Sequence, residues 1–280
     1  MSRIILSLLL ALSLTAVAAE PPPLSITGDP VQGGLLFART APGALVQLDG
    51  RSLRVSPSGG FLVGFGRDQI EPVTLSVTGE DGATLSRTLD VRPREYSIQR
   101  VDGLPGSRVS PPPEVSQRIG LEAARIRLAR NHDDQRADFE SGFIWPLQGP
   151  ITGVYGSQRI LNGEPRQPHY GVDVAAPSGT PVVAPADAVV SLVEPDMYFS
   201  GGTLLMDHGH GLSSTFIHLS KILVEQGQQV KQGQVVAEVG ATGRASGPHL
   251  DWRMNLFEIR LDPALVVGPM PGPDDSDPAQ

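Results

Sequence analysis

Five of the six histidines in this chain of 280 residues lie in the range 168–254. Histidine is the commonest metal ligand and the usual acid–base group near neutral pH. Two of these histidines are followed by an aspartate within four residues: His169 precedes Asp173 by four, and His249 precedes Asp251 by two. This window therefore indicates a metal site or an acid–base pair.

The first pair can share one ion only if the backbone bends between its members. On a straight strand, His169 and Asp173 would stand about 13 Å apart, which is too far for one metal. On a helix they would be about 6 Å apart, but Pro168 and Gly171 are poor helix residues. Because glycine tolerates unusual dihedral angles, we expect a bend at Gly171.

The second pair needs no bend. On a strand over 250–257, His249 and Asp251 would lie on one face, about 6–7 Å apart at their backbones. His218 follows a β-like run and can reach the same face from a neighbouring strand. Three ligands drawn from such His and Asp residues, plus an open position, fit a catalytic zinc site, in which the ion polarises a carbonyl and activates water. Histidines left over would act as acid–base groups.

The other three histidines are expected outside the site. His208 and His210 stand in the run Asp-His-Gly-His-Gly at 207–211, where a glycine-rich hairpin turn explains them. His132 lies on the charged side of a predicted helix and is expected to be a solvated surface residue.

Composition narrows the function classes. The chain has no cysteine, so it has no disulfides, and any metal site must use His, Asp or Glu. The net charge of −8 and the pI near 5.2 argue against nucleic acid as a partner, because a basic patch is the usual footprint of such a protein.

The N-terminus predicts a secretory signal peptide over residues 1–19. Arg3 supplies a positive start, 4–14 is almost wholly apolar, and small residues at 16–19 offer cleavage positions. The alternative is a retained membrane anchor, although the apolar run is shorter than the about 20 residues of a spanning helix. Either way the mature chain would face outward from the cytoplasm.

The elements that must position these residues are mostly β. Residues 20–106 predict an N-terminal accessory domain, a small antiparallel β-sandwich, because short strand candidates recur about every ten residues. These candidates are 35–38, 45–48, 53–55, 61–65, 73–78 and 85–91. Residues 107–143 predict a linker with one connecting α-helix over about 113–136, packed between the domains.

Residues 144–267 predict a C-terminal antiparallel β-sheet core, and the Pro-, Asp- and Gly-rich tail 268–280 predicts disorder. The strand candidates of this domain are 151–155, 180–184, 188–193, 202–206, 212–216, 235–239 and 250–257.

At the level of motifs, residues 145–263 resemble the lysostaphin/LytM-type zinc metallopeptidases, which cut peptide cross-links in bacterial cell walls. The resemblance rests on several short runs in the family's order and spacing. They include HYGVD at 169–173, PSGTPV at 177–182, HLS at 218–220 and GPHL at 247–250.

This resemblance implies a metalloendopeptidase with an open groove, one Zn²⁺ ion and the stem peptides of peptidoglycan as substrate. It places two metal ligands on His169 and Asp173 and a third at Asp251. It makes His218 and His249 the catalytic residues.

Asp251 departs from the family pattern, which has histidine as the third ligand. Aspartate binds zinc through oxygen, but two aspartates and one histidine would formally cancel the charge of the ion. Oxygen ligands also admit other divalent metals. The alternative function is therefore a catalytically degenerate protein of this fold that binds the wall or activates another wall hydrolase. The other four functional positions are kept, which favours activity.

The front half of the chain also resembles the accessory region of secreted Gram-negative members. Such a region could hold the catalytic domain near the wall or occlude its groove, and other wall hydrolases or division proteins are possible partners. The segment 159–167 could border the cleft, with Asn162 near the substrate. A further resemblance, of 225–236 to the strands of biotinyl or lipoyl carrier domains, lacks a hairpin lysine to modify.

Overall fold

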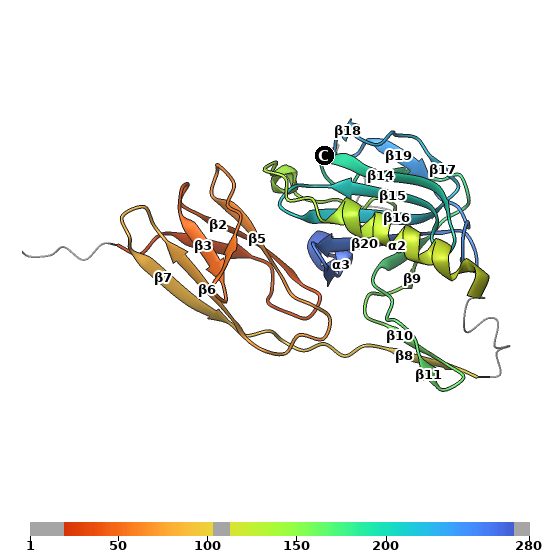
Figure 1. Cartoon of the computed structure of the whole chain (residues 1–280), viewed down its shortest axis with the longest axis horizontal. Helices are drawn as coiled ribbons and strands as arrows, with labels where there is room; N and C mark the ends of the chain where they lie inside the picture. The colour runs from red at the N-terminus through yellow and green to blue at the C-terminus, as the bar shows by residue number, and fades with distance from the viewer. Residues whose placement is uncertain (1–19, 103–112, 272–280) are drawn as a thin grey trace, which may run out of the picture.

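The structure, a computed structural model, describes residues 20–102 and 113–271. The predicted signal peptide at 1–19 and the end of the predicted tail lie outside these residues. Figure 1 shows a smaller β-domain from the N-terminal third of the chain and a larger one from the C-terminal half, which confirms the mostly β prediction. Within the described part of the chain, no helix has the length and apolar character needed to cross a membrane.

The N-terminal domain is the predicted sandwich of two antiparallel sheets. One sheet has the order β1 (Leu24–Thr27), β2 (Leu35–Thr40), β5 (Gly60–Gly64). The other has the order β4 (Arg51–Leu53), β3 (Leu45–Leu48), β6 (Val73–Thr78), β7 (Thr84–Leu89). Alternate residues of β6, Val73, Leu75 and Val77, are buried, as period-two patterning requires.

One predicted strand of this domain lies two residues too far along the chain. The prediction of a strand at 53–55 is wrong, because the two-residue turn at Asp49 and Gly50 returns the chain into pairing at once, with Leu48 opposite Arg51. Both turn residues have positive φ, 48° and 77°, as such tight hairpins require.

The connecting helix is shorter than predicted and packs elsewhere. It begins with a 3-10 turn, η1 (Pro113–Val115), and continues as α2 (Ser116–Arg130), so the predicted end at 136 is wrong. The side chain of Asp134 accepts a hydrogen bond from Arg136 N at 2.8 Å, a local turn that competes with the helix. The helix lies against β14 (Ala188–Met197) and β15 (Gly201–Asp207) rather than between the domains (Figure 1). A second 3-10 turn, η2 (Asp138–Ser141), follows.

The C-terminal domain is built on one large antiparallel sheet. Its order is β18 (Gln229–Val230), β14, β15, β16 (Leu212–Leu219), β20 (His249–Leu256), β12 (Val172–Ala175), β9 (Ile151–Gly153), and β21 (Ile259–Leu261) also pairs with β20. A smaller sheet contains β13 (Pro181–Val183), β19 (Val235–Glu238) and β17 (Lys221–Ile222). The hairpin of β10 (Gln158–Leu161) and β11 (Glu164–Pro165) pairs with β8 (Ile98–Val101), a parallel strand from the end of the region predicted as the N-terminal domain.

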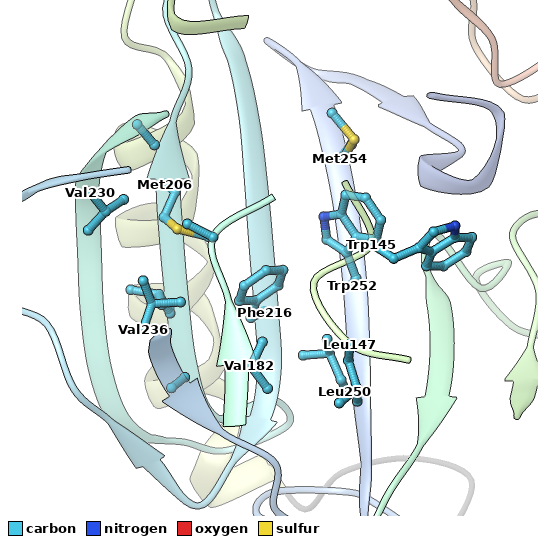
Figure 2. Close-up of a cluster of buried hydrophobic side chains, with 14 of the residues drawn as sticks. Trp145, Leu147, Val182, Met206, Phe216, Val230, Val236, Leu250, Trp252 and Met254 are labelled. Atoms are coloured by element: carbon cyan, nitrogen blue, oxygen red, sulfur yellow. The ribbon is translucent and has the colours of Figure 1, made fainter. Parts of the chain in front are cut away.

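Strand β20 separates the core from the site. Its even-numbered residues Leu250, Trp252 and Met254 are fully buried and lie in the hydrophobic cluster of Figure 2. The Trp252 ring meets the Trp145 ring edge-on, with centroids 5.8 Å apart. Because side chains alternate along a strand, the odd-numbered residues from His249 onward lie on the opposite face.

The chain stays packed beyond the last strand. A short helix, α3 (Pro263–Val267), is capped by the Asp262 side chain, which accepts a hydrogen bond from Ala264 N. Trp145 Nε1 then donates to the Gly268 carbonyl at 3.2 Å, and Met270 packs against the large core. The described start of the predicted tail is therefore in contact with the domain.

Candidate metal centre

Three of the predicted site residues meet at the junction of β12 and β20. Asp173 and Asp251 are register partners on these neighbouring strands. His169 comes from the segment before β12, and its Nε2 lies 3.1 Å from Asp173 Oδ1 and 3.3 Å from Asp251 Oδ2. Potential ligand atoms of the three side chains all lie within 4.8 Å of one another.

The expected bend is present at Gly171, directly before β12 begins. A side chain there has no room, because a Cβ would collide with the Asp251 carboxylate and would lie 2.7 Å from the Trp252 carbonyl oxygen. The bend does not use a positive φ at Gly171, so the glycine is required for space: it leaves room for the third carboxylate beside the chain.

The two predicted catalytic histidines lie beside this cluster. His249 opens β20, and its Nε2 is 3.8 Å from Asp173 Oδ1. His218, near the end of β16, places its ring 4.9 Å from the His249 ring, centroid to centroid. The structure therefore brings together all five residues that the sequence selected.

Each of these imidazoles is oriented by a backbone carbonyl. His218 Nδ1 donates to the Thr242 carbonyl and His249 Nδ1 to the Gly247 carbonyl, both at 2.8 Å. His169 Nδ1 lies 3.2 Å from the Val154 carbonyl. With Nδ1 as the donor, Nε2 is the nitrogen of each ring that is left to take a metal or a proton, which is the second-shell arrangement usual for ligating histidines.

The electrostatics of the cluster favour a cation. Burial alone would lower the pKa of His169, but Asp173 and Asp251 outweigh it and raise that pKa to about 10. Burial would raise the pKa of Asp251, but the charge of Arg253 and the bonds from His169 and Arg253 hold it well below its usual range. The His169 proton thus supplies positive charge where two carboxylates converge.

These residues fit a zinc ion. The donor set is one imidazole nitrogen and two carboxylates, all of them ligand types that zinc accepts. Asp173 Oδ1 is buried, and its charge is met by the protonated His169 ring, whose Nε2 lies 3.1 Å away but outside hydrogen-bond geometry. A buried carboxylate oxygen without a full hydrogen bond is unfavourable, and a cation bound here would satisfy it.

Arg253 was missed by the sequence reasoning. Its Nε donates to Asp251 Oδ1 at 2.9 Å and its Nη2 to Asp251 Oδ2 at 2.6 Å. The signal that could have found it was an opposite charge two residues along the same strand, hence on the same face.

The histidines assigned to the turn do lie outside the cluster. His208 is fully buried, with Nδ1 donating to the Asp187 carbonyl at 2.8 Å and Nε2 2.9 Å from Ser214 Oγ. His210 packs its ring against Phe139, centroids 5.0 Å apart. His132 is exposed, as predicted.

The N-terminal domain reaches the segment that carries His169. Arg67 donates from Nε and Nη2 to the Gly156 carbonyl, at 3.0 and 2.7 Å. Gly156 N in turn donates to the His169 carbonyl at 2.7 Å. Asn162, at the tip of the β10–β11 hairpin, has a φ of 52°, and its place at the cleft stays a prediction.

Comparison with known proteins supports the family resemblance independently of the geometry. The model of peptidase family M23 matches residues 167–263. A crystal structure from Pseudomonas aeruginosa, assigned to peptidase M23, is 32% identical with a TM-score of 0.66. The similarity covers 86% of this chain and 96% of that one.

Two curated relatives share shorter stretches. One from Haemophilus influenzae, described as an uncharacterized metalloprotease, is 39% identical over 193 residues, 69% of this chain and 36% of its own length. The peptidoglycan DD-endopeptidase ShyB of Vibrio cholerae is 40% identical over 114 residues, 41% of this chain and 24% of its own length. This chain therefore spans about a third or less of the length of these two relatives. Since the similarity to the Pseudomonas structure runs through nearly all of both chains, and the site has the geometry described above, the chain belongs to peptidase family M23.

Proposed function

We propose that the protein is a zinc-dependent endopeptidase, exported to the periplasm or secreted, that hydrolyses peptide cross-links of bacterial peptidoglycan. The observation that carries this proposal is the convergence of His169, Asp173 and Asp251 within 4.8 Å, beside a pair of histidines. One zinc ion would be held by these three residues, leaving a position open to substrate.

The chemistry divides between the ion and the two histidines. Bound zinc would supply a Lewis acid for the scissile carbonyl. Burial lowers the pKa of His218, so this side chain is neutral near pH 7 and can accept a proton at Nε2. His249, whose ring lies next to it, would donate from Nε2, when that nitrogen carries a proton, to the oxygen that becomes negative, and His218 would return the proton that it took to the leaving amine.

The substrate class is supported by the relatives rather than by the geometry. ShyB is described as a peptidoglycan DD-endopeptidase, and its similarity to this chain is in keeping with a wall peptide as substrate. The predicted signal peptide at 1–19 would bring the protein to the wall.

A second candidate function has one observation in its favour. Asp251 is engaged on both oxygens by Arg253, so the third ligand position is already paired without a metal. A protein with this pair and no metal affinity would act as a wall-binding or hydrolase-activating module instead.

Metal analysis beside a wall-hydrolysis assay separates the two functions. The full-length protein, purified without chelators, should carry close to one zinc ion and release soluble peptides from purified sacculi. His169→Ala should lose both properties, and His132→Ala, which changes an exposed histidine outside the site, should keep both. Wild-type protein that binds zinc but leaves sacculi intact would overturn the enzymatic proposal.

A further inference from the structure

Arg253 and Asp251 form a closed pair on the site face of β20. Both are odd-numbered residues of the strand, so their side chains rise from the same face. The guanidinium meets the carboxylate with two roughly parallel hydrogen bonds, of 2.9 and 2.6 Å. Such a fork fixes the plane of a carboxylate as well as its position.

Asp251 needs this support more than a histidine ligand would. Its side chain is 4% exposed, and a buried carboxylate without a partner is strongly unfavourable. It is also shorter than imidazole, so a small rotation moves its oxygens away from the other ligands. Oδ2, which receives Arg253 Nη2, is also the oxygen 3.3 Å from His169 Nε2.

The pair also restores the charge of the site. Two carboxylates and a neutral imidazole bring a formal charge of −2, which would cancel a divalent ion. Arg253 adds +1, so the occupied site would carry +1, as a site with one carboxylate and two imidazoles does. The charge of the ion drives its effect on bound groups, so this balance matters for function.

We propose that Asp251 and Arg253 together replace the third histidine ligand, with Arg253 as the positioning residue that orients the Asp251 carboxylate and balances its charge. This inference rests on the metal site of the proposed function, and it concerns binding of the ion rather than hydrolysis.

The test is a double-mutant cycle on the full-length protein, read as zinc affinity by competition with a chromogenic chelator. In the wild-type background, Arg253→Gln should weaken zinc binding about 10–100-fold, the usual cost of losing an outer-shell partner. In the D251H background, Arg253→Gln should not weaken zinc binding. A histidine ligand needs neither the two hydrogen bonds from Arg253 nor its positive charge. The d–d absorption of the Co²⁺-loaded protein should change with Arg253→Gln in the first background and stay the same in the second.

A nearby arginine provides the matched control. Arg260 is on β21, beside β20, and directs its side chain to Asn255 Oδ1 at 3.5 Å and to the Tyr170 ring. Arg260→Gln should leave the zinc affinity within about threefold of wild type, well below the 10–100-fold loss that removal of an outer-shell partner causes. Thermal unfolding of each metal-free variant reports whether it folds.

Three results would overturn the inference. They are wild-type affinity in Arg253→Gln, tighter binding in that variant, and an equal loss in both backgrounds. If Arg253→Gln weakens zinc binding in the wild-type background alone while the protein leaves sacculi intact, that result would support the role of Arg253 and would refute only the enzymatic function.

Discussion

Among single residues, His218 combines strain with a chemical role. Its φ of 67° lies in the left-handed region, which residues other than glycine seldom adopt, and the residue is 6% exposed. Such strain persists where the surrounding structure fixes a functional group. Here His218 N donates to the Ser200 carbonyl and Nδ1 to the Thr242 carbonyl, both at 2.8 Å.

We therefore expect His218→Ala to lose hydrolysis and keep the metal. Removal of a proton acceptor should lower kcat about 10²–10⁴-fold. Zinc content should stay near that of wild type, because His218 is not one of the three clustered ligands. Steady-state kinetics on a defined cross-linked peptide, run beside elemental analysis, checks both points, and loss of zinc in this variant would place His218 among the ligands.

His208 should make the protein less stable in acid. Burial lowers its pKa to about 4, against an ordinary value of 6.5. The unfolded chain therefore binds a proton between pH 6.5 and 4 that the folded protein refuses, so stability falls with decreasing pH across this window. The loss should approach about 3 kcal/mol below pH 4.

Urea unfolding of wild type and His208→Gln at several pH values measures this contribution. The variant should be less stable at pH 7, because it disturbs the hydrogen bonds to Asp187 and Ser214. Its stability should nevertheless fall less steeply from pH 6.5 to 4. An unchanged slope would exclude His208 as a source of acid sensitivity, and His132→Gln, at an exposed position, should keep the wild-type slope.

The clustering of the five candidate residues could be predicted from the sequence for a physical reason, whereas their individual roles came from the family resemblance and stay predictions. His169, Asp173, His218, His249 and Asp251 carry their chemistry in their types and spacing, and the bend at Gly171 follows from the distance between the first two. Arg253 carries a weaker signal, an opposite charge two residues from Asp251, because an arginine on a strand more often faces solvent. The structure shows its side chain turned back along β20 to Asp251.

Among the strands and helices, the presence of an element was predicted more reliably than the residue at which it ends. The strands β3 and β6 match 45–48 and 73–78, because period-two burial marks them directly. By contrast, β16 runs three residues past the predicted end at 216, through His218 to Leu219. The helix α2 stops early because polar side chains after Arg130 form turns, a competition that periodicity does not register.

The loop before β12 is held by a contact that no local pattern predicts. Arg67, 12% exposed at its side chain, donates twice to the Gly156 carbonyl, and its guanidinium lies 4.3 Å from the centre of the Tyr96 ring. Gly156 is linked by its amide to the His169 carbonyl. The N-terminal domain thus fixes the element that carries the first ligand.

Arg67→Ala should loosen this loop. Loss of the charged hydrogen bonds should lower the free energy of unfolding by about 2 kcal/mol. Hydrogen–deuterium exchange at the Gly156 and His169 amides should become faster, while exchange in β16 stays unchanged. Arg51→Ala, at an exposed arginine of the same domain, is the control, and wild-type exchange at both amides in Arg67→Ala would contradict this role.

In the whole molecule, the two β-domains pack against each other and are not joined by the linker alone. Leu35 and Leu62 come from the N-terminal sandwich but belong to the large hydrophobic cluster of the C-terminal domain. Gly64 lies so close to Leu256 and Leu261 that a Cβ would stand 3.2 Å from each side chain. Two groups of strand candidates, separated by a predicted linker and helix, predicted two domains but could not predict this shared core, and the boundaries at 106, 143 and 267 stay predictions.

The contact between the domains includes one ion pair whose acid is buried. Arg94 Nη2 lies 2.8 Å from Asp262 Oδ2, and the side chains are 27% and 4% exposed. Arg94→Ala would leave the Asp262 carboxylate buried without its cation, and the pKa of Asp262 is already raised by burial. We expect the free energy of unfolding to fall by about 2–4 kcal/mol. This is at the lower end of the usual cost of breaking a buried ion pair, because Arg94 is partly exposed.

The neighbouring ion pair supplies the control. Arg92 and Asp29 lie 2.9 Å apart with exposed side chains, so Arg92→Ala should cost less than about 1 kcal/mol. Chemical denaturation of both variants at pH 7, followed by tryptophan fluorescence, measures the difference. Because Trp145 and Trp252 both lie in the large core, the signal reports the C-terminal domain, although Arg94 belongs to the N-terminal side of the contact. Equal, small effects of the two substitutions would mean that the domains fold independently of this pair, whereas a large effect of Arg94→Ala alone would make the N-terminal domain a stabilising part of the peptidase domain.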